Sequence, residues 1–419
     1  MATRKTSRPT HARVAGAALA VTLAAACDRS PAPAAPPTTT TTTAIAAPPS
    51  TAPPAPPPPP ETHVAPSSCA PAGPARTLLS IEGARSLRVD SVTLGSPVAA
   101  VVFFEGTSGR LLRVDASGEA IGDPIPLTDP GQLDGSFHVR ANGDALDVVY
   151  ADYRSRAQTG IDLVARTIGA TGELGPKVVL DHDVPFGWAD AWDVVLDEAG
   201  VLLVEANADQ DGVGPGTIDV RFGPVGGPLA RAAHFPYPFA PSPPGDTPAS
   251  TSLSVARTPE GYAIGWSAGN EAGTRAGTQA LDGSGAVRGE STPLALDGAL
   301  PRWIDGAWIA ERARGGHFET ASVPVTSEST WTPVTAPAPV TRGRLVALGG
   351  RTWARLDTCV TDSCSPIERV LVPLSASREA MGPPVALGRA GELAIGPDGR
   401  GALVTAEGGT LTWQSLACR

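Results

Sequence analysis

The stretch FHVRANGDALDVVYAD, Phe137–Asp152, places a tight Asn-Gly-Asp turn between two runs rich in alternating apolar residues. Alternation with a period of two is typical of a half-buried β-strand, and a Gly-centred turn between two such runs is typical of a β-hairpin. The stretch therefore predicts two antiparallel strands joined by a tight turn.

The same pattern recurs along the chain at intervals of roughly 45 to 60 residues, a period within the range of repeat folds. Six further stretches have it: Leu87–Phe104, Trp192–Asn207, Leu253–Ala268, Pro301–Ala313, Arg344–Asp357 and Glu392–Ala406. A second hairpin follows most of them, with turns such as DASGE at Asp115–Glu119. No helical period of useful length interrupts the series, so the sequence predicts an all-β repeat domain.

Four short strands per unit, in seven units, resemble a seven-bladed β-propeller. The resemblance runs from about Thr77 to Arg419 and concerns the architecture alone. It implies that each unit buries its apolar faces against its neighbours, which lets a long chain form a continuous core without helices. The alternatives are six or eight blades, or a pair of β-sandwiches.

The last unit lacks an outer strand, and the N-terminal end of the domain offers one. After the hairpin at Glu392–Ala406 the chain adds TLTWQSL, Thr410–Leu416, and then ends. The stretch RTLLSIEG, Arg76–Gly83, reads as a strand that would complete this unit. Pairing would protect two exposed strand edges, and β-propellers commonly close in this way.

Two cysteines flank these terminal strands, and two others lie close together. Cys69 precedes the first strand and Cys418 follows the last, so we expect a disulfide between them. Antiparallel neighbouring strands are not expected to set these two cysteines directly opposite each other. We therefore expect the two cysteine-bearing segments to lie parallel or to flank each other. The spacing of Cys359 and Cys364 suits a loop staple in an oxidising compartment. The alternative is a four-cysteine zinc site, which the lack of paired Cys-x-x-Cys spacing disfavours.

The N-terminus has the form of an export signal. A basic start is followed by the uncharged run VAGAALAVTLAAA, Val14–Ala26, and this order is typical of signal peptides. The run is too short for a membrane-spanning helix, which needs about 20 apolar residues. We therefore expect the protein to be exported.

The stretch LAAAC, Leu23–Cys27, resembles the lipobox of bacterial lipoproteins. It departs from that pattern at Ala24, where the lipobox favours Leu. The resemblance, to a bacterial lipoprotein with a β-propeller domain, implies that Cys27 is acylated and becomes the new N-terminus. The protein would then be held at the membrane by lipid, facing the periplasm or the cell exterior. The alternative is ordinary secretion with a coincidental cysteine.

The segment after Cys27 is composed of Pro, Ala, Thr and Ser and includes TTTTTT and PPPPP. Such a composition cannot bury a core, and its proline runs favour an extended, semi-rigid spacer. The sequence thus predicts three segments: a lipoprotein signal peptide at 1–26, a disordered linker at 27–76 and a β-propeller domain at 77–419.

The chain is acidic, with 32 Lys and Arg against 42 Asp and Glu and a net charge of −10. No basic patch of the kind that nucleic-acid binding requires is evident in the sequence. We therefore expect no nucleic-acid partner.

The longest connections fall on one predicted face. In a blade of strands a to d, the b–c and d–a connections share a face, and they include the long segments Asp181–Trp192, Ala206–Gly216 and His234–Ser250. These segments carry the aromatic residues Phe186, Trp188, Trp192, Phe235, Tyr237 and Phe239. Binding residues gather on loops that a rigid scaffold holds.

Aromatic rings flanked by carboxylates suit carbohydrates or extended peptides. We predict Trp188, Trp192 and Tyr237 as ligand contacts, because large rings give contact area at low entropy cost. The alternative is that the rings pack the loops onto the propeller.

One stretch resembles part of a calcium loop. In NADQDG, Asn207, Asp209 and Asp211 take its first, third and fifth positions. Pro215 and Ile218 then stand at the ninth and twelfth positions, so the closing carboxylate is missing. The alternative is a polar turn, and calcium is the one cofactor that the sequence suggests.

The chain lacks H-E-x-x-H and the phosphate-binding pattern G-x-x-x-x-G-K, and it offers no complete catalytic motif. The predicted function is that of a lipid-anchored extracytoplasmic binding or scaffolding module whose ligand is a glycan or a protein. The alternatives are a glycan-acting propeller hydrolase or lyase and an assembly factor of the cell envelope. A deep polar central pocket would favour the enzyme, and a shallow aromatic face would favour the binding module.

Overall fold

The computed structural model describes residues 69–82, 87–128, 137–153, 161–182, 192–207, 217–236, 250–270, 273–294, 299–325, 329–359, 367–396 and 398–418. The chain divides into two compact units, Met1–Pro60 and Glu61–Arg419, and all described residues belong to the second. No helix in these ranges is long and apolar enough to cross a membrane. The predicted signal peptide, Cys27 and most of the predicted linker lie outside the described residues.

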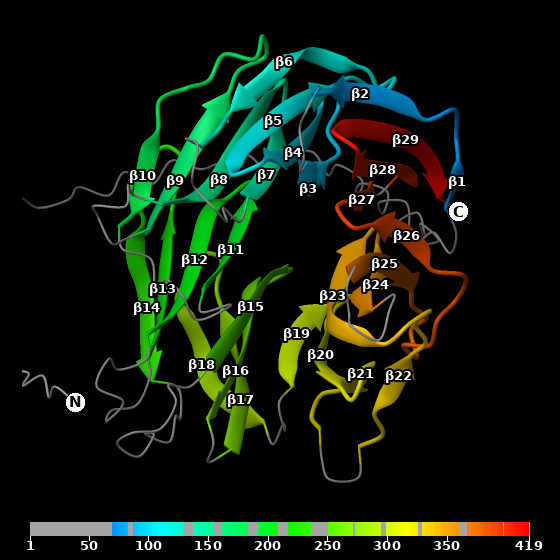
Figure 1. Ribbon diagram of the computed structural model, residues 1–419. Helices are drawn as coiled ribbons and strands as arrows, with labels where there is room; N and C mark the ends of the chain where they lie inside the picture. The colour runs from blue at the N-terminus through cyan, green and yellow to red at the C-terminus, as the bar shows by residue number, and fades with distance from the viewer. Residues whose placement is uncertain are drawn as a thin grey trace, which may run out of the picture. The chain divides into compact units, whose positions relative to one another are not determined.

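Seven antiparallel sheets surround a common centre, which makes the second unit a seven-bladed β-propeller (Figure 1). Blade 1 consists of β3 (Leu87–Thr93), β4 (Ala99–Glu105), β5 (Ser108–Val114) and β6 (Ala120–Pro126). Blade 2 consists of β7 (Phe137–Asn142), β8 (Ala145–Tyr153), β9 (Ile161–Ile168) and β10 (Val178–Asp181). Blade 3 consists of β11 (Trp192–Asp197), β12 (Gly200–Asn207), β13 (Thr217–Gly223) and β14 (Ala230–Pro236).

The next three blades repeat the arrangement. Blade 4 consists of β15 (Ser250–Thr258), β16 (Gly261–Asn270), β17 (Gly273–Leu281) and β18 (Val287–Leu294). Blade 5 consists of β19 (Leu300–Ile304), β20 (Ala307–Arg314), β21 (His317–Ser322) and β22 (Thr332–Val334). Blade 6 consists of β23 (Val340–Leu348), β24 (Arg351–Cys359), β25 (Ile367–Pro373) and β26 (Val385–Gly388).

Blade 7 joins the two ends of the domain. It consists of β27 (Glu392–Ile395), β28 (Arg400–Glu407) and β29 (Thr410–Cys418), with β1 (Cys69–Pro71) and β2 (Arg76–Ser80) both paired to β29. Within blades 1 to 6 the strands follow the order of the sequence, and the first strand of each is innermost. Each of the seven predicted hairpins forms the two inner strands of one blade, so the seven-bladed prediction is confirmed.

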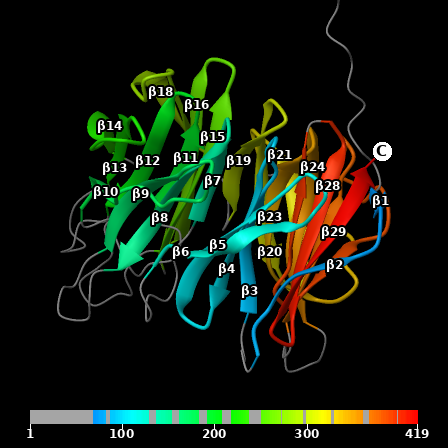
Figure 2. The same ribbon diagram turned by 90° about the horizontal axis from the view of Figure 1, so that it is seen from above.

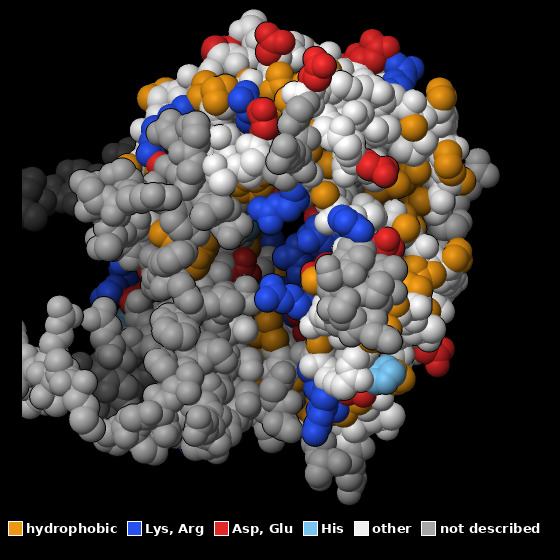
Figure 3. Space-filling view, viewed as in Figure 1, with side chains coloured by type: hydrophobic (Ala, Val, Ile, Leu, Met, Phe, Trp, Pro, Cys, Tyr) orange, Lys and Arg blue, Asp and Glu red, His pale blue; other side chains and the backbone are white. Residues whose placement is uncertain are grey.

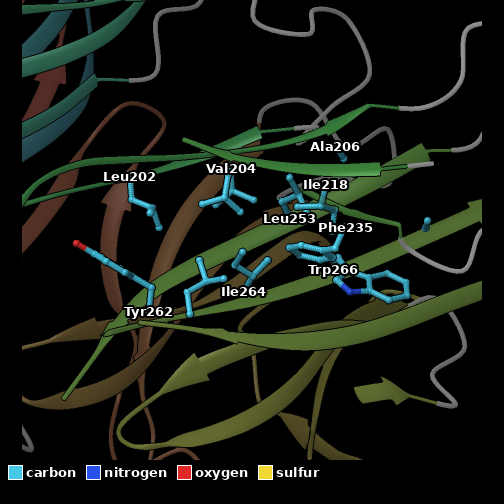
Figure 4. Packing of buried hydrophobic residues seen from close by; sticks show 12 residues of the cluster. Leu202, Val204, Ala206, Ile218, Phe235, Leu253, Tyr262, Ile264 and Trp266 are labelled. Atoms are coloured by element: carbon cyan, nitrogen blue, oxygen red, sulfur yellow. The ribbon is translucent and has the colours of Figure 1, made fainter. Parts of the chain in front are cut away.

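Hydrophobic packing between blades follows the alternation in the sequence. Seven clusters of buried side chains are present in the described residues, one at each of the seven boundaries between neighbouring blades, including the boundary between blades 7 and 1. Between blades 3 and 4, for example, Ile218 and Phe235 meet Trp266 (Figure 4). A sheet in a propeller is covered on both faces, which is why the inner strands read as nearly continuous apolar runs.

The N-terminal strand completes the last blade, as the sequence predicted. β2 pairs antiparallel with β29, with Arg76 opposite Trp413 and Ser80 opposite Thr410. The two strands lie side by side in both views (Figures 1 and 2). Leu78 of β2 joins the cluster between blades 7 and 1, so the closing strand also contributes to the core.

A disulfide joins Cys69 to Cys418, as predicted, but not in the expected placement. The short strand β1 pairs antiparallel with β29, and the two cysteines are direct register partners. The expected geometry was wrong, because antiparallel pairing sets the first residue of one strand opposite the last residue of its neighbour. Cys359 is disulfide-bonded, whereas Cys364 lies outside the described residues, so the pairing of these two stays a prediction.

The bridge between the termini is expected to stabilise the ring. It closes a loop with a sequence separation of 349 residues, and loop-closure entropy grows with the length of the loop. The double variant Cys69→Ser/Cys418→Ser is expected to lower the free energy of unfolding by about 2–5 kcal/mol, measured by urea denaturation. As a control, Cys359→Ser/Cys364→Ser would open a far shorter loop and is expected to cost about 2 kcal/mol or less. An unchanged stability of the terminal variant would contradict a role of the bridge in closure.

Candidate functional site

A cavity of about 710 Å³ lies among the inner strands of the propeller. Phe137 and His138 begin β7, Trp192 and Asp193 begin β11, and all four line it. The beginning of an inner strand is the end at which the connection from the preceding blade attaches. The cavity therefore lies toward the face on which the sequence predicted the long loops. Figure 3 shows this hollow near the middle of the view, with Lys and Arg side chains along one side.

The described lining of the cavity is more basic than acidic. Its arginines are Arg302, Arg312, Arg342, Arg344, Arg355 and Arg369, and its carboxylates are Asp90, Asp193, Glu311 and Asp357. The six arginines outnumber the four carboxylates, although the whole chain carries a net charge of −10. All six arginines come from blades 5 and 6, so the positive charge gathers on one side of the cavity. Such a concentration of one sign of charge in a concave site attracts ions of the opposite sign.

Four of these arginines are ion-paired: Arg302 with Glu311, Arg312 with Glu319, Arg355 with Glu392, and Arg369 with both Asp357 and Glu392. The Arg369 contacts measure 3.1 Å from Nε to Asp357 Oδ1 and 2.7 Å from Nη1 to Glu392 Oε1. Glu392 belongs to blade 7, so it neutralises blade 6 across the boundary between the two blades.

The side chains of the remaining two, Arg342 and Arg344, form no ion pair or hydrogen bond with any residue that the structure describes, and both are exposed to the cavity. They lie two residues apart on β23, and side chains at this spacing point to the same side of a strand. Gly343 separates them because a Cβ at this position would lie 2.4 Å from the ring of Phe318 in blade 5. Close packing between blades 5 and 6 therefore explains the glycine, and the cavity explains the two arginines.

Positive charge is crowded in blade 6. Arg344 is the register partner of Arg355, and like charges directly opposite each other in a sheet are destabilising. Burial, together with Arg344 and Arg369, lowers the pKa of Arg355 to about 10, although Glu392 acts in the opposite direction. An anion beside Arg342 and Arg344 would relieve this repulsion.

Three of the four lining carboxylates bind the backbone of the next blade. The bonds are Phe137 N to Asp90 Oδ2 (3.4 Å), Val255 N to Asp193 Oδ2 (2.8 Å) and Leu345 N to Glu311 Oε2 (2.7 Å). Each donor belongs to an inner strand, whose central edge has no neighbouring strand. These carboxylates therefore hold adjacent blades in place as well as lining the cavity.

Asp90 and His138 are the titratable groups whose neutral forms the cavity favours. Burial raises the pKa of Asp90 to about 6, despite the nearby guanidinium groups of Arg88, Arg355 and Arg344. Burial lowers the pKa of His138. The charge of Asp193 opposes this shift, whereas the charge of Arg344 adds to it. The hydrogen bond from Phe137 N to Asp90 is the longest of the three inter-blade bonds, which leaves this carboxyl the least committed to the scaffold.

Of the aromatic residues that the sequence proposed as ligand contacts, Trp192 is described. It is half-buried, lines the cavity and packs against the cluster between blades 2 and 3. Phe235, which lies in the third long segment, is buried in the core between blades 3 and 4. It therefore packs its segment onto the propeller, which was the alternative to a ligand contact. Trp188 and Tyr237 lie outside the described residues.

The predicted calcium loop cannot be placed from the described residues. Asn207 ends β12 with its side chain undescribed, and Asp209 and Asp211 lie outside the described ranges. No group of three or more His, Cys, Asp or Glu side chains with metal-binding geometry occurs in the described part of the chain.

Charged residues also gather where the predicted long loops attach. Arg221 Nε lies 2.8 Å from Asp181 Oδ2 and 3.6 Å from Glu205 Oε2. His234 Nδ1 lies 3.0 Å from Asp219 Oδ1. Burial, followed by the charge of Asp181, raises the pKa of Glu205 to about 7. The arginine compensates these carboxylates within blades 2 and 3, so the group reads as part of the scaffold.

Sequence reasoning missed the arginines of the cavity. The signal was present, since Arg342, Arg344, Arg351, Arg355 and Arg369 fall close together in an acidic chain. Their neutralising partners, however, include Glu392 in another blade. The arginines that stay unpaired can therefore be identified only from the assembled blades and not from the sequence.

No protein-family model and no curated protein matches this chain. Among solved structures, prolyl oligopeptidase B from Galerina marginata is 10% identical over 76% of this chain and 47% of its own, with a TM-score of 0.47. The periplasmic gluconolactonase of Pseudomonas aeruginosa is 16% identical over 80% of this chain and 97% of its own, with a TM-score of 0.43. An α-L-arabinanase from Penicillium chrysogenum is 10% identical over 72% of this chain and 99% of its own, with a TM-score of 0.43.

The chain spans about half the length of the prolyl peptidases that it matches, 46% in one case and 47% in another. At identities this low the likeness is one of fold alone, and no activity follows from it.

The raised pKa of Asp90 gives a pH-dependent expectation. Because folding raises this pKa from 3.8 to about 6, the ionised carboxylate destabilises the folded state above about pH 6. This cost fades as the pH falls through 6 and is gone below about 3.8, where the group is protonated in both states. Asp90→Asn, whose amide oxygen can still accept from Phe137 N, is therefore expected to melt at a higher temperature at pH 8 and like the wild type near pH 4.

The matched control is Asp123→Asn, which changes an exposed aspartate on β6 and is expected to shift neither melting temperature. A lower melting temperature of Asp90→Asn at pH 8 would show that the arginines need the charge of Asp90.

Proposed function

We propose that this protein is an exported, lipid-anchored binding module that takes an anionic ligand into the central cavity of its propeller. The observation that carries the proposal is the pair Arg342 and Arg344, which face the cavity and form no ion pair with a described carboxylate. Asp357, which lies opposite Arg342 in the sheet, is paired with Arg369 instead. Guanidinium groups bind carboxylates and phosphates in bidentate fashion, and such charge-assisted bonds are among the stronger ones in proteins. Shape and charge thus favour one ligand anchored on blade 6.

The enzyme alternative is the second candidate, because the cavity is central and polar, as we expected of a glycan-acting hydrolase or lyase. Such chemistry requires titratable groups that are free to act on a substrate. Asp193 and Glu311 accept hydrogen bonds from the backbone of the next blade, and Asp357 is paired with Arg369. Asp90 and His138 remain as the acid–base candidates. An enzyme would use these two residues of the lining, whereas a binding role also uses its arginines.

Export and anchoring give the module its location. The Cys69–Cys418 disulfide is consistent with an oxidising compartment outside the cytoplasm. The lipobox-like stretch ending at Cys27 supplies the proposed anchor, and the Pro-rich segment after it supplies the spacer. A cell-envelope partner that binds other faces of the propeller would be compatible with this arrangement.

Removing the two unpaired arginines is expected to abolish most of the anion binding. Citrate, inorganic phosphate and D-glucuronate serve as probes, titrated into the full chain by calorimetry at low ionic strength. Hydrogen bonds to charged groups contribute about 1.5–3 kcal/mol, so Arg342→Ala and Arg344→Ala are each expected to weaken the tightest probe about 10- to 100-fold. High salt is expected to weaken it as well.

Arg288→Ala is the matched control, since Arg288 on the outer strand β18 pairs with Glu260 in the turn between β15 and β16, and neither residue lines the cavity. Binding that is equal in the control and in both cavity variants would refute the site, and so would the absence of binding by all three probes.

The anchor has its own test. Cys27→Ser is expected to remove the acyl-dependent mass increase and to release the protein from the membrane fraction of a bacterial host. Mass spectrometry of the mature N-terminus reads the outcome directly. A wild-type protein that is cleaved elsewhere and carries no acyl group would contradict lipid anchoring.

A further inference from the structure

Three serines line the cavity in addition to the charged groups. They are Ser91, Ser252 and Ser267, and none of their hydroxyl groups has a hydrogen-bond partner among the residues that the structure describes. The Oγ atom of Ser91 is fully buried and closed to an occupant, which leaves Ser252 and Ser267 as the accessible pair. Buried hydroxyl groups are normally hydrogen-bonded, because leaving one unpaired costs free energy. Hydroxyls that face a cavity are therefore candidates to bind its occupant.

Two of these serines form one recognition element. Ser252 on β15 and Ser267 on β16 are direct register partners in blade 4. Directly opposed residues present their side chains on the same face of the sheet, and both side chains line the cavity. A neighbouring serine, Ser254, donates instead to the carbonyl oxygen of Pro301 in blade 5. The unpaired state of Ser252 and Ser267 is thus a property of the cavity and not of every serine in the blade.

Trp192 adds an aromatic ring to the same cavity. It belongs to blade 3, three positions around the ring from the unpaired arginines of blade 6. A ligand held by its charge at Arg342 and Arg344 would extend toward this indole and toward the serines of blade 4. Pyranose rings have an apolar C–H face that can lie against such an indole and a rim of hydroxyls that can bind serine.

We infer that the ligand is a sugar-derived anion, a polyol with one acidic group. Its carboxylate or phosphate binds Arg342 and Arg344, its hydroxyls bind Ser252 and Ser267, and its ring lies near Trp192. The inference rests on the proposed anion site and adds the part of the ligand that is not charged. The cavity, at about 710 Å³, falls within the range of small-molecule sites, roughly 300–1,000 Å³.

The test compares ligands that share one half of this chemistry. D-Glucuronate and glucose 6-phosphate carry both an acidic group and hydroxyls, cyclohexanecarboxylate carries the acid alone, and glucose carries the hydroxyls alone. At least one sugar anion is expected to bind the full chain 10-fold or more tightly than both cyclohexanecarboxylate and glucose, measured by calorimetry and competition. The order of D-glucuronate and glucose 6-phosphate shows whether the acidic group is a carboxylate or a phosphate.

The double variant Ser252→Ala/Ser267→Ala separates the two halves of the site. It is expected to weaken the sugar anion about 10-fold and to leave cyclohexanecarboxylate unchanged, because only the hydroxyl contacts are lost. Arg344→Ala is expected to weaken both ligands, and circular dichroism and the melting temperature show whether the variants stay folded.

Two results would overturn the inference while the anion site stands. One is equal binding of cyclohexanecarboxylate and the sugar anions, and the other is a serine variant that loses both kinds of ligand equally. Glucose binding as tightly as its charged derivatives, or no binding of any anion, would instead remove the proposed anion site itself.

Discussion

Closure of the ring holds all seven blades of this propeller in place. β2, from the N-terminal end of the domain, pairs with β29, and the Cys69–Cys418 disulfide joins the same two ends. With this seam closed, each blade has a neighbour on both faces, and seven hydrophobic clusters fill the seven boundaries. The central cavity is a consequence, because blades 1 to 6 all contribute to its lining.

Closure also sets the charge of the cavity. Glu392 of blade 7 compensates Arg355 and Arg369 of blade 6, and blade 7 is the one that the seam completes. The same crowding leaves Arg342 and Arg344 without a carboxylate partner in the described residues, next to a guanidinium whose pKa burial has already lowered. Excess positive charge in a confined space is costly to the fold, and an anionic ligand would offset that cost. The scaffold and the proposed binding function therefore follow from one arrangement of blades.

The fold was readable from the sequence because its determinants are local. Alternating apolar runs and Gly-centred turns mark each inner hairpin, and the spare strand at Arg76–Ser80 indicated how the ring closes. The site was less readable, because it depends on the register between strands and between blades. Trp192 was singled out as an aromatic residue of a long loop and lies at the cavity, but Arg344 owes its importance to Arg355 opposite and to Glu392 in another blade. The placement of Cys69 opposite Cys418 was misjudged for a similar reason, since it depends on a second short strand, β1.

The proposed function requires an anion to bind between Arg342 and Arg344 inside the propeller. A crystal structure of the protein grown with selenate would show this anion, because anomalous scattering from selenium locates it without assumptions about the natural ligand. We expect a strong anomalous peak within hydrogen-bond distance of both guanidinium groups. Selenate bound only on the outer surface, with an empty cavity and both guanidinium groups unoccupied, would contradict it.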